Sequence, residues 1–167
     1  YTIHYLSTSK SKLVSQNNYK GFFWNPKKSE IDTNALTGVE VIIHLAGASV
    51  AKKWTTAYKE EIIESRVLST QLLYQTLQKN SHQVKQIISA SAVGIYPDSL
   101  TDIYHETDLD IDVSFLGNVV KQWENEVSQF EKLELIVSKI RIGIVLACSR
   151  FSSHFPICNG KPISRCL

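Results

Sequence analysis

Methionine is absent from the 167 residues, and Tyr1 occupies the first position. Because translation begins on methionine, we expect the chain to be a piece of a longer protein. No run of about 18 uncharged apolar residues is present, so we expect no membrane-spanning helix. The sequence does not open with a basic stretch followed by an apolar one, so no signal peptide is expected.

Cysteine is scarce, and its three copies lie at positions 148, 158 and 166. That spacing matches neither a zinc site nor a disulfide framework, so we expect no metal site and a reducing, cytoplasmic environment. The five histidines are scattered and do not change this expectation. The net charge of +2 is too small to indicate a nucleic-acid partner.

Acidic residues are missing from the last segment, which begins at Cys148. This segment also holds all three cysteines and two of the four prolines, so its composition differs from that of residues 1–147. We therefore divide the chain into a partial domain over 1–147 and an atypical tail over 148–167. Whether the tail is disordered, damaged or the stub of a missing segment stays open.

The first 147 residues have the composition and patterning of a globular domain, and 43% of the whole chain is hydrophobic. Apolar runs between turn residues predict strands over 2–6, 21–24, 39–45, 85–93 and 134–147. Helices are predicted over 56–79 and from the N-cap Ser114 to Phe130. Because strands alternate with long helices, the predicted fold is α/β with a Rossmann-like, doubly wound parallel sheet.

Burial can be predicted for three of these elements. The near-continuous apolar run over 39–45 indicates a strand buried on both faces. The helix over 56–79 is expected to bury Ile63, Val67, Thr70, Tyr74 and Leu77. The second helix is expected to bury Leu116, Val120, Trp123, Val127 and Phe130.

Two groups of small residues follow predicted buried strands. Leu45, Ala46 and Gly47 end the run over 39–45, where small residues allow a flat cofactor to approach the backbone. The alternative is a tight turn between strand and loop. Ser89, Ala90 and Ser91 end the next strand, and their hydroxyls are placed to hydrogen-bond a substrate. The alternative there is tight packing under a loop.

Four segments together resemble the extended short-chain dehydrogenase/reductases, and more narrowly their epimerase-like subfamily. They read VIIHLAGASVAKKWTTAYKEEIIESRVLSTQLL, QIISASAVGIYPDS, SFLGNVVKQWENEV and KIRIGIVLA. The resemblance covers roughly residues 2–147 and implies NAD(P) as the cofactor. Such proteins begin with a strand, a Gly-rich pyrophosphate loop and a helix, and they continue into a C-terminal substrate lobe. No GxxGxxG motif occurs here, so we expect the first strand with its loop, and the substrate lobe, to be lacking.

The resemblance also bears on the catalytic residues. Family members use a serine, and a tyrosine and a lysine four residues apart on one helix face. Ser91 matches the serine, but Leu116 and Val120 occupy the tyrosine and lysine positions. The candidate catalytic groups are then Ser91 and Tyr96. Arg66 stands at the position of a helper asparagine, as a substrate anchor or as a structural residue paired with another element, for instance Glu124.

Cofactor choice is predicted from the residues after the strand over 2–6. In this fold an acidic residue at that point favours NAD and a basic one favours NADP. Ser9 and Lys10 stand there, with Lys12 nearby and no acid, so the sequence favours NADP over NAD.

Three functions stay open. The first is a fragment of an NAD(P)-binding epimerase-like oxidoreductase that acts on an unidentified small molecule, such as a nucleotide sugar. The second is a non-catalytic NAD(P)-binding sensor of the same fold. The third is a truncated chain that binds nothing.

Overall fold

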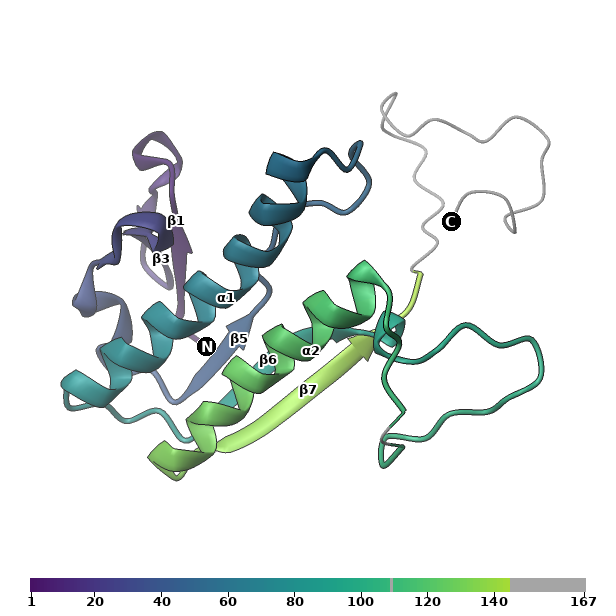
Figure 1. Cartoon of the computed structure of the whole chain (residues 1–167). Helices are drawn as coiled ribbons and strands as arrows, with labels where there is room; N and C mark the ends of the chain where they lie inside the picture. The colour runs from purple at the N-terminus through teal and green to yellow at the C-terminus, as the bar shows by residue number, and fades with distance from the viewer. Residues whose placement is uncertain (109, 145–167) are drawn as a thin grey trace, which may run out of the picture.

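The computed structural model describes residues 1–108 and 110–144, so the tail over 148–167 lies outside the described residues. The chain forms two sheets beside two long helices (Figure 1). Strand β1 (Ile3–Ser7) runs parallel to β3 (Tyr19–Asn25). The short strands β2 (Ser15–Gln16) and β4 (Glu30–Ile31) pair with β3 in the antiparallel sense.

The second sheet is parallel throughout and has the order β5-β6-β7. Its strands are β5 (Val41–His44), β6 (Gln86–Ala92) and β7 (Ile136–Ile142). Helix α1 (Thr56–Lys79) connects β5 to β6, and α2 (Phe115–Ser128) leads to β7. The side chains of Thr55 and Ser114 cap the two helices by accepting backbone N–H groups of the first turn. The predicted α/β fold with a parallel sheet is confirmed.

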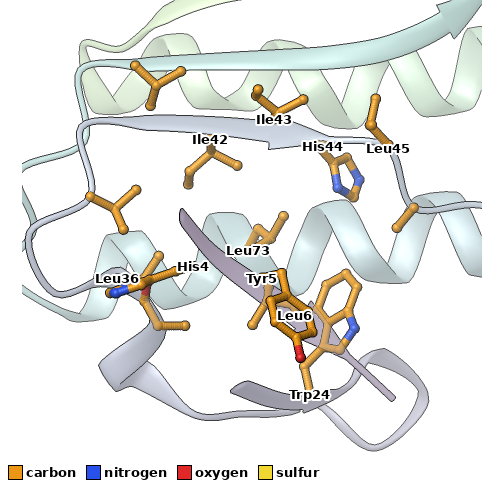
Figure 2. A pocket seen from close by; sticks show the side chains of 14 residues that line it. His4, Tyr5, Leu6, Trp24, Leu36, Ile42, Ile43, His44, Leu45 and Leu73 are labelled. Atoms are coloured by element: carbon orange, nitrogen blue, oxygen red, sulfur yellow. The ribbon is translucent and has the colours of Figure 1, made fainter. Parts of the chain in front are cut away.

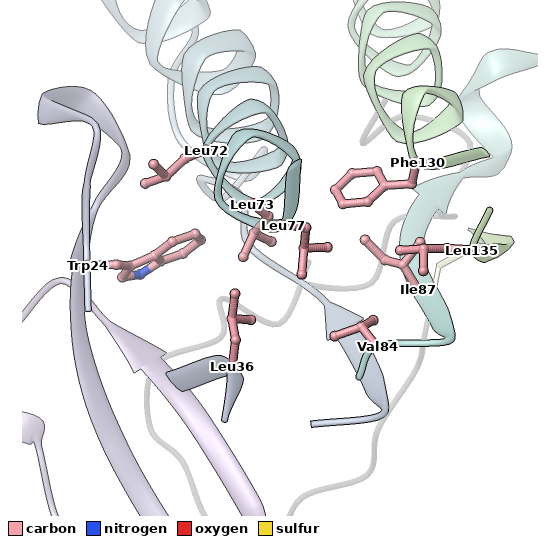
Figure 3. Packing of buried hydrophobic residues seen from close by; sticks show 9 residues of the cluster. All are labelled: Trp24, Leu36, Leu72, Leu73, Leu77, Val84, Ile87, Phe130 and Leu135. Carbon is pink, nitrogen blue, oxygen red and sulfur yellow. The ribbon is translucent and has the colours of Figure 1, made fainter. Parts of the chain in front are cut away.

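Helix α1 lies at the centre of the main core (Figure 3). Leu72 and Leu73 pack with Trp24 of the first sheet, whereas Leu77 packs with Ile87 of the second. The predicted inner stripe of α1 is therefore only partly right. Thr70 and Leu77 are buried as predicted, but Ile63, Val67 and Tyr74 are only half-buried, because the helix contacts two sheets and α2 rather than a single surface.

One face of the second sheet is uncovered by the described residues. Both helices lie on the opposite face (Figure 1). Val41 and Ile43 of β5 are 46% and 65% exposed, so the prediction that this strand is buried on both faces is wrong. Ile136 and Ile140 of β7 point to the same open face and are 63% and 52% exposed.

A cavity of about 440 Å³ separates β1, an outer strand of the first sheet, from β5, an outer strand of the second. We call it the slot (Figure 2). It is lined by His4 and Leu6 on one side, by Ile42 and His44 on the other, and by Leu73 of α1. The slot lies where a doubly wound sheet of order 3-2-1-4-5-6 has its first strand. No strand of residues 1–108 or 110–144 pairs with β1 or β5 on this side.

Candidate functional site

The carboxyl ends of β5 and β6 bring two of the predicted site segments together. His44 and Ser89 are register partners in the parallel ladder. The loop that starts at Leu45 therefore leaves the sheet beside Ser89, Ala90 and Ser91. In open α/β sheets, ligands bind beyond this edge of the strands.

His44 holds the end of β5 against α1. Its Nε2 lies 3.0 Å from Oγ1 of Thr70 and 3.3 Å from Oγ of Ser69. The ring is 3% exposed, and burial lowers the pKa of His44 to about 4. The imidazole is therefore neutral at physiological pH, and its role here is to position the loop that starts at Leu45.

Arg66 of α1 contacts that loop from the other side. Its Nη2 donates to the carbonyl of Ala48 at 3.1 Å, and its Nη1 donates to the carbonyl of Ile62 at 2.9 Å. The guanidinium lies 5.3 Å from the centre of the Trp123 ring, and burial lowers the pKa of Arg66. A Cβ atom on Gly47 would lie 3.0 Å from Cζ of Arg66, so glycine permits this close contact.

The partner suggested for Arg66 is incorrect. Among residues 1–108 and 110–144, no carboxylate forms an ion pair with Arg66. Glu124 pairs with Arg141 of β7 instead. Two N–H groups of Arg66 donate to backbone carbonyls, and its role as a substrate anchor stays a prediction.

Ser91 and Tyr96 lie at two ends of one polar network. Oγ of Ser91 donates to Oε1 of Glu124 at 2.5 Å. Arg141 donates to both oxygens of Glu124, at 2.9 and 3.0 Å, and its Nη1 donates to the Tyr96 hydroxyl at 2.5 Å. That hydroxyl donates in turn to the carbonyl of His105 at 3.0 Å.

Charge in this network is balanced within the protein. Burial acts to raise the pKa of Glu124, but the hydrogen bonds from Arg141 and Ser91 outweigh it and hold this pKa below its usual value. The hydrogen bond to Glu124 raises the pKa of Arg141. The hydroxyl of Ser91 thus donates its hydrogen bond to a carboxylate, and its oxygen can still accept a hydrogen bond from another group.

Sequence reasoning missed Arg141, although β7 carries a signal for it. Lys139 and Arg141 alternate with the exposed Ile140 and Ile142. Charges at every second position of a strand lie on one face. Here that face is covered by α2, so a charged partner on α2 was to be expected.

The residues predicted to choose the cofactor lie just after β1. The backbone N–H of Ser9 donates to Oγ of Ser7, and its own hydroxyl hydrogen-bonds with that of Ser11. Nζ of Lys10 lies 5.0 Å from the centre of the Phe23 ring. Lys10 is exposed, so its charge remains accessible to a ligand.

The two helix positions that differ from the family pattern lie on α2. Val120 is buried and Leu116 is half-buried, so both serve packing.

Within the described ranges, no three histidine, cysteine or acidic side chains gather as a metal site would require. Neither of the two long helices is apolar enough to cross a membrane.

Comparison with known proteins identifies the family of this chain. A model of the NAD dependent epimerase/dehydratase family matches residues 24–114. The chain belongs to this family. It is 37% identical over 131 residues to an epimerase family protein of Staphylococcus aureus strain MRSA252, a match that covers 78% of this chain and 44% of the relative. The chain thus spans less than half the length of the curated relatives that it matches.

Solved structures show the same fold. A nucleoside-diphosphate sugar epimerase from Corynebacterium glutamicum aligns with a TM-score of 0.60 and 31% identity, over 75% of this chain and 25% of that one. A human epimerase family protein solved with NADPH has a TM-score of 0.55 and 22% identity, with coverages of 72% and 38%. UDP-glucuronic acid 4-epimerase from Bacillus cereus, solved with UDP-glucuronic acid and NAD, has a TM-score of 0.61 and 16% identity, with coverages of 75% and 39%.

Proposed function

We propose that this chain is the partial cofactor-binding domain of an NAD(P)-dependent, epimerase-like oxidoreductase that acts on a nucleotide sugar. The observation that carries the proposal is the register of His44 with Ser89, which places the small-residue loop 45–47 beside Ser89, Ala90 and Ser91. The relatives named as nucleotide-sugar epimerases support the substrate class.

The residues present fit one part of a dinucleotide. Ala46 and Gly47 have small side chains or none, and the Arg66 guanidinium lies where a side chain on Gly47 would be, which keeps the loop close to α1. A Gly-rich pyrophosphate loop at a helix N-terminus does not occur in this sequence. When bound, oxidised NAD(P) supplies the group that accepts a hydride from a sugar carbon bearing a hydroxyl.

The chain's own residues then have three tasks. Oγ of Ser91 accepts a hydrogen bond from a substrate hydroxyl, since its proton is held by Glu124. Arg66 borders the loop and offers N–H donors to an anionic group. The proton leaves through Tyr96 or through a second substrate hydroxyl, because Leu116 and Val120 carry no ionisable group.

NADP is the cofactor that we propose over NAD. The basic residues Lys10 and Lys12 lie just after β1, where a 2′-phosphate would lie in this fold. The human relative was solved with NADPH and the B. cereus enzyme with NAD, so family membership alone leaves the choice open.

The test uses a chimera in which residues 1–144 replace the matching segment of the S. aureus relative. The relative supplies the parts of the protein outside the match. Binding of NADP and NAD is followed by fluorescence, and UDP-glucose and UDP-glucuronic acid are tried as substrates. Reduction of the cofactor, seen at 340 nm, or a new sugar nucleotide on chromatography supports the proposal. A chimera that binds a cofactor without turning over either sugar supports a non-catalytic sensor. One that folds and binds no cofactor overturns the assignment.

A further inference from the structure

The ring of Tyr5 lies across the first sheet, on the face opposite to the one whose Leu6 and Trp24 pack in the main core. Its register partner on β3 is Gly21, so the two residues share this outer face. A Cβ atom on Gly21 would lie 2.5 Å from Cζ of Tyr5. Because glycine has no side chain, the Tyr5 ring can lie over β3, where it stacks on Tyr19 with the ring centres 4.6 Å apart.

The hydroxyl of Tyr5 holds the turn that leads from β1 to β2, which we call the lysine turn (residues 8–14). It donates to the carbonyl of Lys12 at 2.6 Å and accepts from the N–H of Val14 at 2.7 Å. The carbonyl of Val14 in turn accepts from the N–H of Gly21 at 2.8 Å. Since β3 lies between β1 and β2, a side chain of β1 crosses the middle strand to fix the backbone beyond it.

The lysine turn carries two positive charges that no carboxylate neutralises. Among residues 1–108 and 110–144, neither Lys10 nor Lys12 forms an ion pair. Nζ of Lys10 lies 5.0 Å from the centre of the Phe23 ring, on the same face as Tyr5. The only regular structure in this segment is one 3₁₀ turn over Lys10–Lys12. Such a short turn has little stability of its own, so contacts from outside it determine where the lysines lie.

We propose that Tyr5 is a positioning residue for the choice of cofactor. Its hydroxyl fixes the backbone of the lysine turn, so that Lys10 and Lys12 contact the 2′-phosphate of NADP together. Cations on a fixed turn lose less conformational entropy when they bind a phosphate than cations on a mobile one. The inference rests on the proposed preference for NADP, and it concerns the hydroxyl of Tyr5 rather than its ring.

The test measures the dissociation constants of NADP and NAD by fluorescence in the chimera with the S. aureus relative. Tyr5→Phe removes the hydroxyl and keeps the ring. Tyr19→Phe is the matched control, because it changes the other ring of the stack and leaves both hydrogen bonds of Tyr5 in place. A further pair of proteins carries Lys10→Ala with Lys12→Ala, either alone or combined with Tyr5→Phe.

Tyr5→Phe is expected to weaken NADP binding by about threefold or more and to leave NAD binding within about twofold. Tyr19→Phe is expected to change neither constant. When both lysines are absent, Tyr5→Phe should no longer alter NADP binding, because the hydroxyl acts through them. A residue that only supported the fold would change the two cofactors' binding alike, with or without the lysines.

Three results would overturn the inference while the NADP assignment stands. They are an unchanged NADP constant in Tyr5→Phe, an equal loss of NADP and NAD binding in that variant, and a loss of NADP binding that persists without the two lysines. The unsubstituted chimera tests the assignment itself. Equal constants for NADP and NAD there would overturn the proposed NADP preference, and the role of Tyr5 with it.

Discussion

Glu124 of α2 and Arg141 of β7 form a two-point ion pair, with Nε and Nη2 of the arginine 2.9 and 3.0 Å from the two carboxylate oxygens. Glu124 is 7% exposed. The pair joins the helix layer to the last strand, and its carboxylate also accepts the Ser91 proton. A single contact therefore links packing of the domain to the predicted catalytic serine. The chimera with the S. aureus relative is the protein in which changes of stability are to be measured.

Replacing Glu124 by glutamine is expected to lower the free energy of unfolding by about 3 kcal/mol, because Arg141 then lacks its anion. Chemical denaturation measures the loss. Glu126→Gln on the same helix is the matched control, since Glu126 forms no ion pair with any described residue, and it should stay within about 0.5 kcal/mol. Equal losses in the two variants would show that the ion pair contributes nothing specific.

The ion pair also predicts an acid response. The folded-state pKa of Glu124 lies below its ordinary value of 4.5. Its contribution is therefore present above pH 4.5 and is lost as the pH falls through the lower folded value. Stability measured between about pH 5 and pH 3 should fall less steeply in Glu124→Gln. An unchanged slope would place the acid sensitivity at other carboxylates.

His44 predicts a second pH effect, in a higher range. Its pKa falls from 6.5 to about 4 on folding, so the unfolded chain binds the extra proton between these values. Stability should decrease by roughly 3 kcal/mol as the pH drops from 6.5 to 4. His44→Gln should remove this decrease, whereas His105→Gln, at an exposed position, should retain it. A decrease that persists in His44→Gln would argue against a buried neutral imidazole.

Tyr96→Phe removes the hydroxyl that lies 2.5 Å from Nη1 of Arg141. If Tyr96 transfers the proton, turnover in the chimera should drop by about 100-fold or more. Tyr104→Phe is the control, because its ring stacks on Tyr96 at 5.1 Å and its hydroxyl is outside the network. Leu116→Ala should act through stability alone. Full activity in Tyr96→Phe would remove Tyr96 from the mechanism.

Cofactor preference is expected to depend on Lys10 and Lys12. The unsubstituted chimera should bind NADP more tightly than NAD. Alanine at either lysine should reduce the ratio of the NAD to the NADP dissociation constant by about threefold or more. Lys20→Ala is a suitable control, because Lys20 lies within β3 and not in the segment that follows β1. Fluorescence titration gives both dissociation constants. A ratio near one before any substitution would contradict the NADP assignment.

Gly47→Ala tests the close contact between the loop and α1. Its Cβ would lie 3.0 Å from Cζ of Arg66, so the guanidinium must move. We expect cofactor affinity to fall by about tenfold, equivalent to roughly 1.4 kcal/mol. Gly94→Ala is the matched control, because a Cβ there meets no atom within 4 Å. Similar affinities in both variants would show that the loop tolerates a side chain.

Local patterns sufficed to predict most elements of the fold. The N-cap Ser114 and the apolar spacing of α2 act within a few residues, and Val120, Trp123, Val127 and Phe130 are buried as predicted. The pattern over 39–45 led to a wrong burial prediction because exposure of Ile43 depends on which segments cover the sheet. No local pattern contains that information.

The site was predictable to a similar extent. The carboxyl ends of neighbouring parallel strands lie at the same edge of the sheet, so the pairing of His44 with Ser89 followed from the order of elements. The pairing of Glu124 with Arg141 joins residues 17 positions apart on different elements and depends on how α2 packs on β7. The sequence offered Ser91 and Tyr96 as candidates, and it did not indicate the ion pair of Glu124 with Arg141 that connects them.

The position of α1 between the two sheets has a consequence for how the chain folds. Leu72 and Leu73 complete the packing of Trp24, and Leu77 completes that of Ile87. Neither sheet has a finished core until this helix is in place, so neither gains much by forming first. The rate-limiting step of folding should thus contain α1 docked on both sheets, and the two sheets should appear together rather than in succession.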